Sequence, residues 1–216
     1  ALPILPHKIS GWGLTGLTIL SISYFLGSES VGIFSALSFL SIIINIFSKS
    51  FFNAYQPWVY QMMQGNNQQQ SKILKMNKIL GISMIILATF LTFFSTEIIS
   101  IFINSRYHTD FIILPVLIFS SLSLFLGSLF TYILYYEHSG RGYISISTFV
   151  GLFTNLLLTV TLTLKYGLIG AVLSLGISNF TTGLLKYYFS KKIVNYDKEQ
   201  FIDLYLIAII LLIVGI

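Results

Sequence analysis

One lysine of this chain lies inside a long apolar segment and is accompanied by amide side chains. Asn45, Lys49, Asn53 and Gln56 follow one another at spacings of four, four and three residues, so all four lie on one face of a helix. A charge at depth in a bilayer costs at least a few kcal/mol, so such residues usually face a cavity or a transport pathway. The stripe predicts a membrane protein with a wet, electropositive interior.

The composition places the whole chain in a membrane. Hydrophobic residues make up 55% and charged residues 9% of the 216 residues, and the mean hydropathy is +0.85. Soluble domains carry about 25% charged residues, so this chain lies far outside that class. An aromatic content of 16% fits the Tyr- and Phe-rich belts found at membrane interfaces.

Several function classes are disfavoured by what the sequence does not contain. There is no cysteine, and His7, His108 and His138 have no paired ligand spacing, so no metal site is expected. No GxxxxGK[ST] loop is present, so neither a nucleotide nor any other cofactor is expected. The net charge of +5 is spread over short loops between apolar spans, which indicates membrane topology rather than nucleic-acid binding.

Hydropathy predicts an all-α, polytopic transmembrane bundle of about seven spans, because about 20 apolar residues cross the hydrocarbon core as a helix. The second span is long enough to overshoot the bilayer or bend, and Pro57 is the expected position of a kink. Residues 95–108 are expected to form a short interfacial helix. The chain begins at Ala1 and ends in an apolar run, so we expect one lobe of a longer protein, residues 1–216, with a truncated last span. The predicted spans are 8–26, 31–63, 72–94, 110–136, 143–164, 167–189 and 201–216.

Basic residues are distributed unequally between the two sides of this predicted bundle. If successive connections between the spans lie on alternate sides of the membrane, one side carries two basic residues, Arg106 and Lys165, and the other carries nine. Lys49, inside a span, is the last of the twelve basic residues. By the positive-inside rule the richer side is cytoplasmic. The nine are Lys8, Lys72, Lys75, Lys78, Arg141, Lys186, Lys191, Lys192 and Lys198.

Several short motifs, in this order and spacing, resemble the polysaccharide flippases of the multidrug/oligosaccharidyl-lipid/polysaccharide exporter superfamily. Residues 31–35 resemble that family's VGIYS segment, with Phe34 in place of the usual Tyr. The strongest part of the resemblance is an IST, G, N and YGxxGA pattern that spans two helices. The matching positions are Leu2-Pro3, 31–35, Pro57, 97–99, 105–107, 146–148, Gly151, Asn155 and 166–171.

The resemblance implies a two-lobed, all-helical exporter in which this chain is the C-terminal lobe. It implies the transport of an undecaprenyl-diphosphate-linked oligosaccharide, as used for O-antigen or capsule, from the cytoplasmic to the outer leaflet of the bacterial inner membrane. Transport would proceed by alternating access, driven by an ion gradient or the membrane potential, and no bond would be made or broken. The implied partners are the lipid-linked oligosaccharide, the bilayer, the N-terminal lobe, and polysaccharide polymerase and chain-length proteins.

Lys49 then has two interpretations. In one it faces the central cavity and attracts the diphosphate, while Asn45, Asn53 and Gln56 bind phosphate or sugar oxygens. In the other it lies near the cytoplasmic interface and its side chain reaches water. The flanking amides favour the cavity.

The remaining candidates also have a functional and a structural interpretation. His7 and Lys8 mark the cytoplasmic end of the first span, where a headgroup would enter, or they anchor that span. Arg106 would meet substrate on the outer side, or it is a solvated loop charge. Asn155 would contact substrate, or it hydrogen-bonds to a neighbouring helix.

Acidic residues separate the rival functions. No carboxylate lies in the middle of a predicted span, whereas a proton-coupled exporter of cationic drugs needs a buried one. A membrane polymerase or ligase would need a large outer loop rich in Arg, His or Asp, and the outer connections here are short. A passive scaffold in a glycan-assembly complex would not need the polar stripe.

Overall fold

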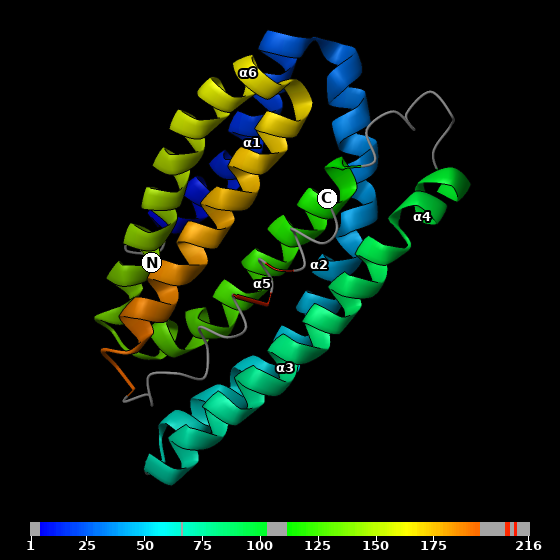
Figure 1. Ribbon diagram of the computed structural model, residues 1–216. Coiled ribbons are helices and arrows are strands. Elements are labelled where there is room, and N and C mark those ends of the chain that lie inside the picture. The colour runs from blue at the N-terminus through cyan, green and yellow to red at the C-terminus, as the bar shows by residue number, and fades with distance from the viewer. Residues whose placement is uncertain (1–4, 66, 103–111, 195–205, 208–209, 211–216) are drawn as a thin grey trace.

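The computed structural model describes residues 5–65, 67–102, 112–194, 206–207 and 210, and these are almost entirely α-helical, with no strand among them. The helices pack side by side into an elongated bundle (Figure 1). Within the described residues they are α1 (Leu5–Leu26), α2 (Ser28–Met63), α3 (Asn67–Phe93), α4 (Ser95–Phe102), α5 (Ile113–Tyr136) and α6 (Gly140–Ser190).

Four of these helices are long and apolar enough to cross a membrane: α1 over Ile9–Leu26, α3 over Gln70–Phe93, α5 and α6. The bent helix α2 makes a fifth candidate. The structure confirms an all-helical fold with four or five candidate membrane spans among the described residues, whereas the predicted seven spans remain a prediction. The predicted seventh span, 201–216, lies almost wholly outside the described residues.

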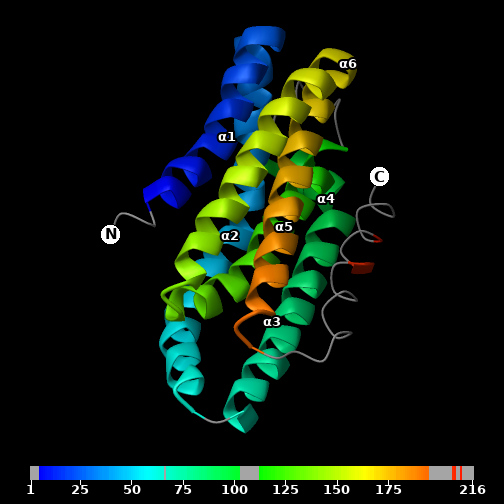
Figure 2. The ribbon, with the colours of Figure 1, turned by 90° about the vertical axis from the view of Figure 1, so that its left-hand side faces the viewer.

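Helix α6 is a hairpin rather than one rod. Its 51 residues would reach about 77 Å at 1.5 Å per residue, over twice the hydrocarbon thickness. Gly167 breaks it with φ 60° and ψ −138°, a backbone region that glycine enters readily and other residues rarely do. The two arms, 140–166 and 168–190, run back along each other, and a Cβ at Gly151 would collide with Thr182 (Figures 1 and 2). The predicted spans 143–164 and 167–189 fall on these two arms.

Helix α5 forms the centre of the bundle. Most of its residues are buried, and it packs against α2, α3 and both arms of α6, while α1 packs against α6 and α2. Gly127 permits one very close crossing, because a Cβ there would lie 2.7 Å from the Cα of Gly183 on α6. Small residues of this kind let transmembrane helices approach closely enough for good packing.

Helix α2 bends, but not where its sequence predicts. Ser28–Phe39 and Ser41–Met63 meet at an angle of 43°, whereas Pro57, the expected kink, lies within the second of these segments. At the bend the Ser41 hydroxyl donates a hydrogen bond to the Ser38 carbonyl at 2.8 Å. Side-chain hydrogen bonds to a carbonyl of the preceding turn compete with the helical ladder and bend helices.

Successive connections between the helices lie at opposite ends of the bundle, as the count of basic residues on the two sides assumed. Figure 1 shows the α2–α3 connection, the α5–α6 connection and the end of α6 towards one end, with the α1–α2 connection and the turn at Gly167 towards the other. The short helix predicted in 95–108 is present as α4. There Thr96 donates a hydrogen bond to exposed Glu97 at 2.8 Å, which lowers the pKa of that carboxyl.

Candidate functional site

A cavity of about 330 Å³ lies between α1, α2, α5 and both arms of α6, inside segments long enough to span a membrane. Its volume lies at the lower end of the range of small-molecule sites in proteins. Polar groups reach it from all of these helices, although apolar residues predominate in the surrounding bundle. Its polar lining consists of His7, Thr15, Ser38, Ser41, Asn45, Ser120, Ser121, Thr148, Asn179, Thr182 and Lys186.

Lys186 is the cation of this cavity. It lies on the second arm of α6 and is only 6% exposed. No acidic side chain lines the cavity in the described part of the chain, and the three described carboxylates, Glu29, Glu97 and Glu137, are all exposed. Burial of a lysine without a counter-charge is costly, which marks the position as one suited to an anionic ligand.

Two hydrogen bonds between helical segments hold the polar lining in place. Asn179 Nδ2 donates to Ser120 Oγ at 2.9 Å and joins α6 to α5. Thr148 Oγ1 donates to the Ile144 carbonyl at 2.9 Å and therefore accepts from His7 Nδ1, 2.7 Å away, across α6 and α1. The buried Ser38 hydroxyl oxygen has no hydrogen-bond partner among the described residues, although it lines the same cavity. Hydroxyl and amide groups of this kind suit the oxygens of a phosphate.

The predicted stripe on α2 meets this cavity only at one end. Half-buried Asn45 lines it, whereas Lys49, Asn53 and Gln56 are exposed on the outer face of α2. Gln56 Nε2 donates to the Tyr60 hydroxyl at 3.3 Å, one turn further along the same helix. His7, also predicted from the sequence, joins Asn45 in the lining. The stripe is therefore divided between the cavity and a face that no described residue covers.

Two predicted residues cannot be placed in the same way. Arg106 lies outside the described residues, as does the side chain of Lys8, whose backbone belongs to the first turns of α1.

Asn155 lies at a helix contact. It is fully buried, and its amide is 3.4–3.5 Å from Thr18 Oγ1 on α1, while the Thr18 hydroxyl also donates to the Leu14 carbonyl. Asn155 is not among the residues that line the cavity. This arrangement favours the structural interpretation, in which an amide joins two transmembrane helices.

The contact gives a stability prediction. Asn155→Leu is expected to lower the free energy of unfolding by about 1 kcal/mol. Thermal denaturation of Asn155→Leu, Thr18→Val and the double variant measures the coupling between the two side chains. Thr161→Val is the matched control, because exposed Thr161 bonds only within its own helix. Unchanged stability of Asn155→Leu would contradict the structural role.

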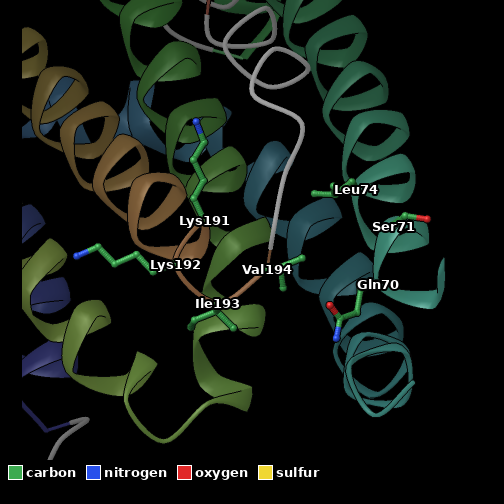
Figure 3. A pocket seen from close by; sticks show the side chains of 7 residues that line it. All are labelled: Gln70, Ser71, Leu74, Lys191, Lys192, Ile193 and Val194. Carbon is green, nitrogen blue, oxygen red and sulfur yellow. The ribbon is translucent and has the colours of Figure 1, made fainter. Parts of the chain in front are cut away.

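A second hollow, of about 400 Å³, lies between the start of α3 and the end of α6 (Figure 3). Figure 3 shows Gln70 and Ser71 on one side of it, and Lys191 and Lys192 turned away from them. Lys191 Nζ lies 4.3 Å from the centroid of the Tyr187 ring, and Lys192 Nζ lies 5.3 Å from that of Tyr143. Both lysines line the hollow, and these cation–π contacts engage their ammonium groups with aromatic rings.

Sequence reasoning missed Lys186, although the sequence contains a signal for it. Ser174, Ser178, Thr182 and Lys186 follow at strict spacings of four on one helical face, which is the pattern used to single out Lys49. Lys186 was instead counted among the nine cytoplasmic loop charges, because it lies near the end of its apolar segment. Without it eight basic residues remain on that side against two, so the predicted orientation stands.

Comparison with known proteins links the chain to polysaccharide biosynthesis. It is 27% identical over 185 residues to the capsular polysaccharide biosynthesis protein CapF of Staphylococcus aureus. The match covers 83% of this chain and 46% of CapF, so the chain spans about half the length of this curated relative. No family model matches the chain. No solved structure matches it either.

Proposed function

We propose that this chain is one lobe of a flippase that moves an undecaprenyl-diphosphate-linked oligosaccharide from the cytoplasmic to the outer leaflet of a bacterial membrane. The observation that carries the proposal is the cavity between candidate membrane-spanning helices, with its buried cation, Lys186. The diphosphate is the strongly charged group that every such substrate carries, so a lysine surrounded by hydroxyl and amide groups is the complement it needs. The CapF match supports the polysaccharide part of the proposal.

The second lobe supplies the rest of the pathway in this proposal. The chain corresponds to 46% of its relative, and a second bundle of similar size would cover the exposed face of α2. Lys49, Asn53 and Gln56 would then line the space between the lobes and lead towards the cavity beside Asn45. Rigid-body rocking of two such lobes around a shared site is how many transporters expose it alternately to the two sides.

The rival functions fit less well. An exporter of cationic drugs needs an acidic group in its cavity, and the described lining contains none. A membrane polymerase or ligase would activate its substrate with acidic or basic side chains on the outer side, whereas this cavity lies between the helices and the cation in its lining, Lys186, is on the predicted cytoplasmic half of its arm.

The proposal is tested in cells that lack their own flippase and produce a matched lipid-linked oligosaccharide. We expect the full-length protein to restore display of the glycan on the outer leaflet, measured by surface labelling, and to leave efflux of cationic dyes unchanged. Dye efflux without glycan export would indicate the drug exporter, and absence of both would contradict transport.

The same cells test the role of Lys49. Lys49→Ala is expected to reduce glycan export at least fivefold, because the cation in the pathway is lost, and Lys49→Arg is expected to retain export. Lys78→Ala is the control, since Lys78 is an exposed lysine in the first half of α3 and does not line the cavity. Normal export by Lys49→Ala would place Lys49 among the lysines whose side chains reach interfacial water.

A further inference from the structure

Four half-buried tyrosines gather at the end of the bundle that is predicted to be cytoplasmic. We call Tyr60, Tyr132, Tyr135 and Tyr136 the tyrosine cluster. Tyr132 and Tyr135 have ring centroids 6.4 Å apart, and Tyr60 of α2 lies 6.1 Å from Tyr136 of α5. The cluster therefore spans two helices near their ends.

The cluster adjoins the cavity through His7, which lines the cavity and contacts one of the tyrosines. The His7 ring stands edge-on to Tyr135, with centroids 6.5 Å apart, and His7 lines the cavity that contains Lys186. On the other side Tyr132 packs against Phe52, whose ring centroid is 5.1 Å away. A series of ring contacts thus leads from His7 in the cavity lining through Tyr135 and Tyr132 to Phe52 of α2.

Interface anchoring does not account for this arrangement. An anchoring tyrosine is expected to expose most of its surface to the lipid headgroups, and Tyr24, with 83% of its surface exposed, fits that description. In the cluster Tyr60 and Tyr136 instead face one another across α2 and α5, Tyr132 and Tyr135 lie one turn apart on α5, and all four are half-buried. Among the described residues no hydrogen bond is formed by the hydroxyls of Tyr132, Tyr135 or Tyr136, whereas Tyr60 accepts one from Gln56.

We infer that the tyrosine cluster binds the sugar part of the substrate while Lys186 holds its diphosphate; this rests on the proposed function. Pyranose rings present C–H groups on their faces and hydroxyls around their edges. The negative face of an aromatic ring attracts the first, and a free phenolic hydroxyl hydrogen-bonds the second. The glycan would dock at the predicted cytoplasmic mouth of the cavity, beside the anion site.

Binding of two lipids separates glycan recognition from anion recognition. The full-length protein in lipid nanodiscs is titrated with undecaprenyl diphosphate and with the undecaprenyl-diphosphate-linked repeat unit of the producing strain. Tyr135→Leu is expected to weaken binding of the sugar-bearing lipid about three- to tenfold, the contribution of one aromatic contact, and to leave binding of the sugarless lipid unchanged. Lys186→Met is expected to weaken binding of both lipids.

The controls distinguish the failure of each hypothesis. Tyr24→Leu removes an exposed tyrosine elsewhere and should change neither affinity. Tyr135→Phe keeps the ring and should retain part of the preference for the sugar-bearing lipid. If Tyr135→Leu weakens binding of both lipids equally, or of neither, the cluster does not bind the glycan, even where the proposed flippase function holds. If the unaltered protein binds neither lipid, the proposed function itself fails.

Discussion

Lys186→Met is expected to abolish transport while leaving the fold as stable as before, or more so. The lysine is 6% exposed in a cavity without a carboxylate among its described lining residues, so its charge is held there at a cost. Methionine has a similar length, and its apolar side chain removes that cost. We expect the free energy of unfolding to stay the same or rise by about 1 kcal/mol. Export should fall at least tenfold, because a charge-assisted contact to the diphosphate is lost.

Export is expected to fall while the free energy of unfolding does not fall, and this combination makes the prediction specific. A residue needed only for folding would lose stability and export together, whereas a residue without a role would change neither. Lys192→Met is the matched control, because Lys192 lies just beyond the end of the same arm, exposed and in contact with aromatic rings. Lys186→Arg preserves the charge in a larger side chain and should retain part of the export. Full export by stably folded Lys186→Met would overturn the anion site.

The elements of the fold could be predicted because they depend on local properties. Apolar segments of span length gave α1, α3 and α5 within a few residues, and the positive φ of Gly167 matches the break predicted between 164 and 167. The bend of α2 could not be located, since it coincides with a serine–carbonyl hydrogen bond rather than with the obvious proline.

The site was only half predictable because periodicity shows which residues share a face but not what that face meets. The α2 stripe and the stripe ending at Lys186 have the same spacing, yet the second is buried against other helices and the first is mostly exposed. Asn45 and His7 were found because a polar residue in or beside an apolar span is conspicuous. Asn179 and Ser120 were not found, because what makes them important is a hydrogen bond between two helices, and the two residues lie 59 positions apart in the sequence.

The close crossing of α5 and α6 gives the largest expected effect on stability. A Cβ at Gly127 would lie 2.7 Å from the Cα of Gly183 and 3.5 Å from its backbone nitrogen, and a backbone cannot move aside as a side chain can. Gly127→Leu must therefore push the two helices apart, at a cost of about 3 kcal/mol or more, and Gly127→Ala should cost about 1–2 kcal/mol. Thermal denaturation and the yield of folded protein measure both effects.

The same crossing connects stability to the site, because it sets the distance between the helices that line the cavity. Ser120 and Asn179, whose hydrogen bond joins the cavity walls, lie on these two helices, and Lys186 follows one turn after Gly183. The Gly127→Ala protein that still folds should therefore export less per molecule, with weaker binding of undecaprenyl diphosphate. Gly32→Ala and Gly32→Leu are the controls, since an added Cβ at Gly32 meets nothing within 4 Å. Equal stability of the Gly127 and Gly32 variants would mean that α5 and α6 do not cross at Gly127 and Gly183. The helices that line the cavity would then be arranged differently.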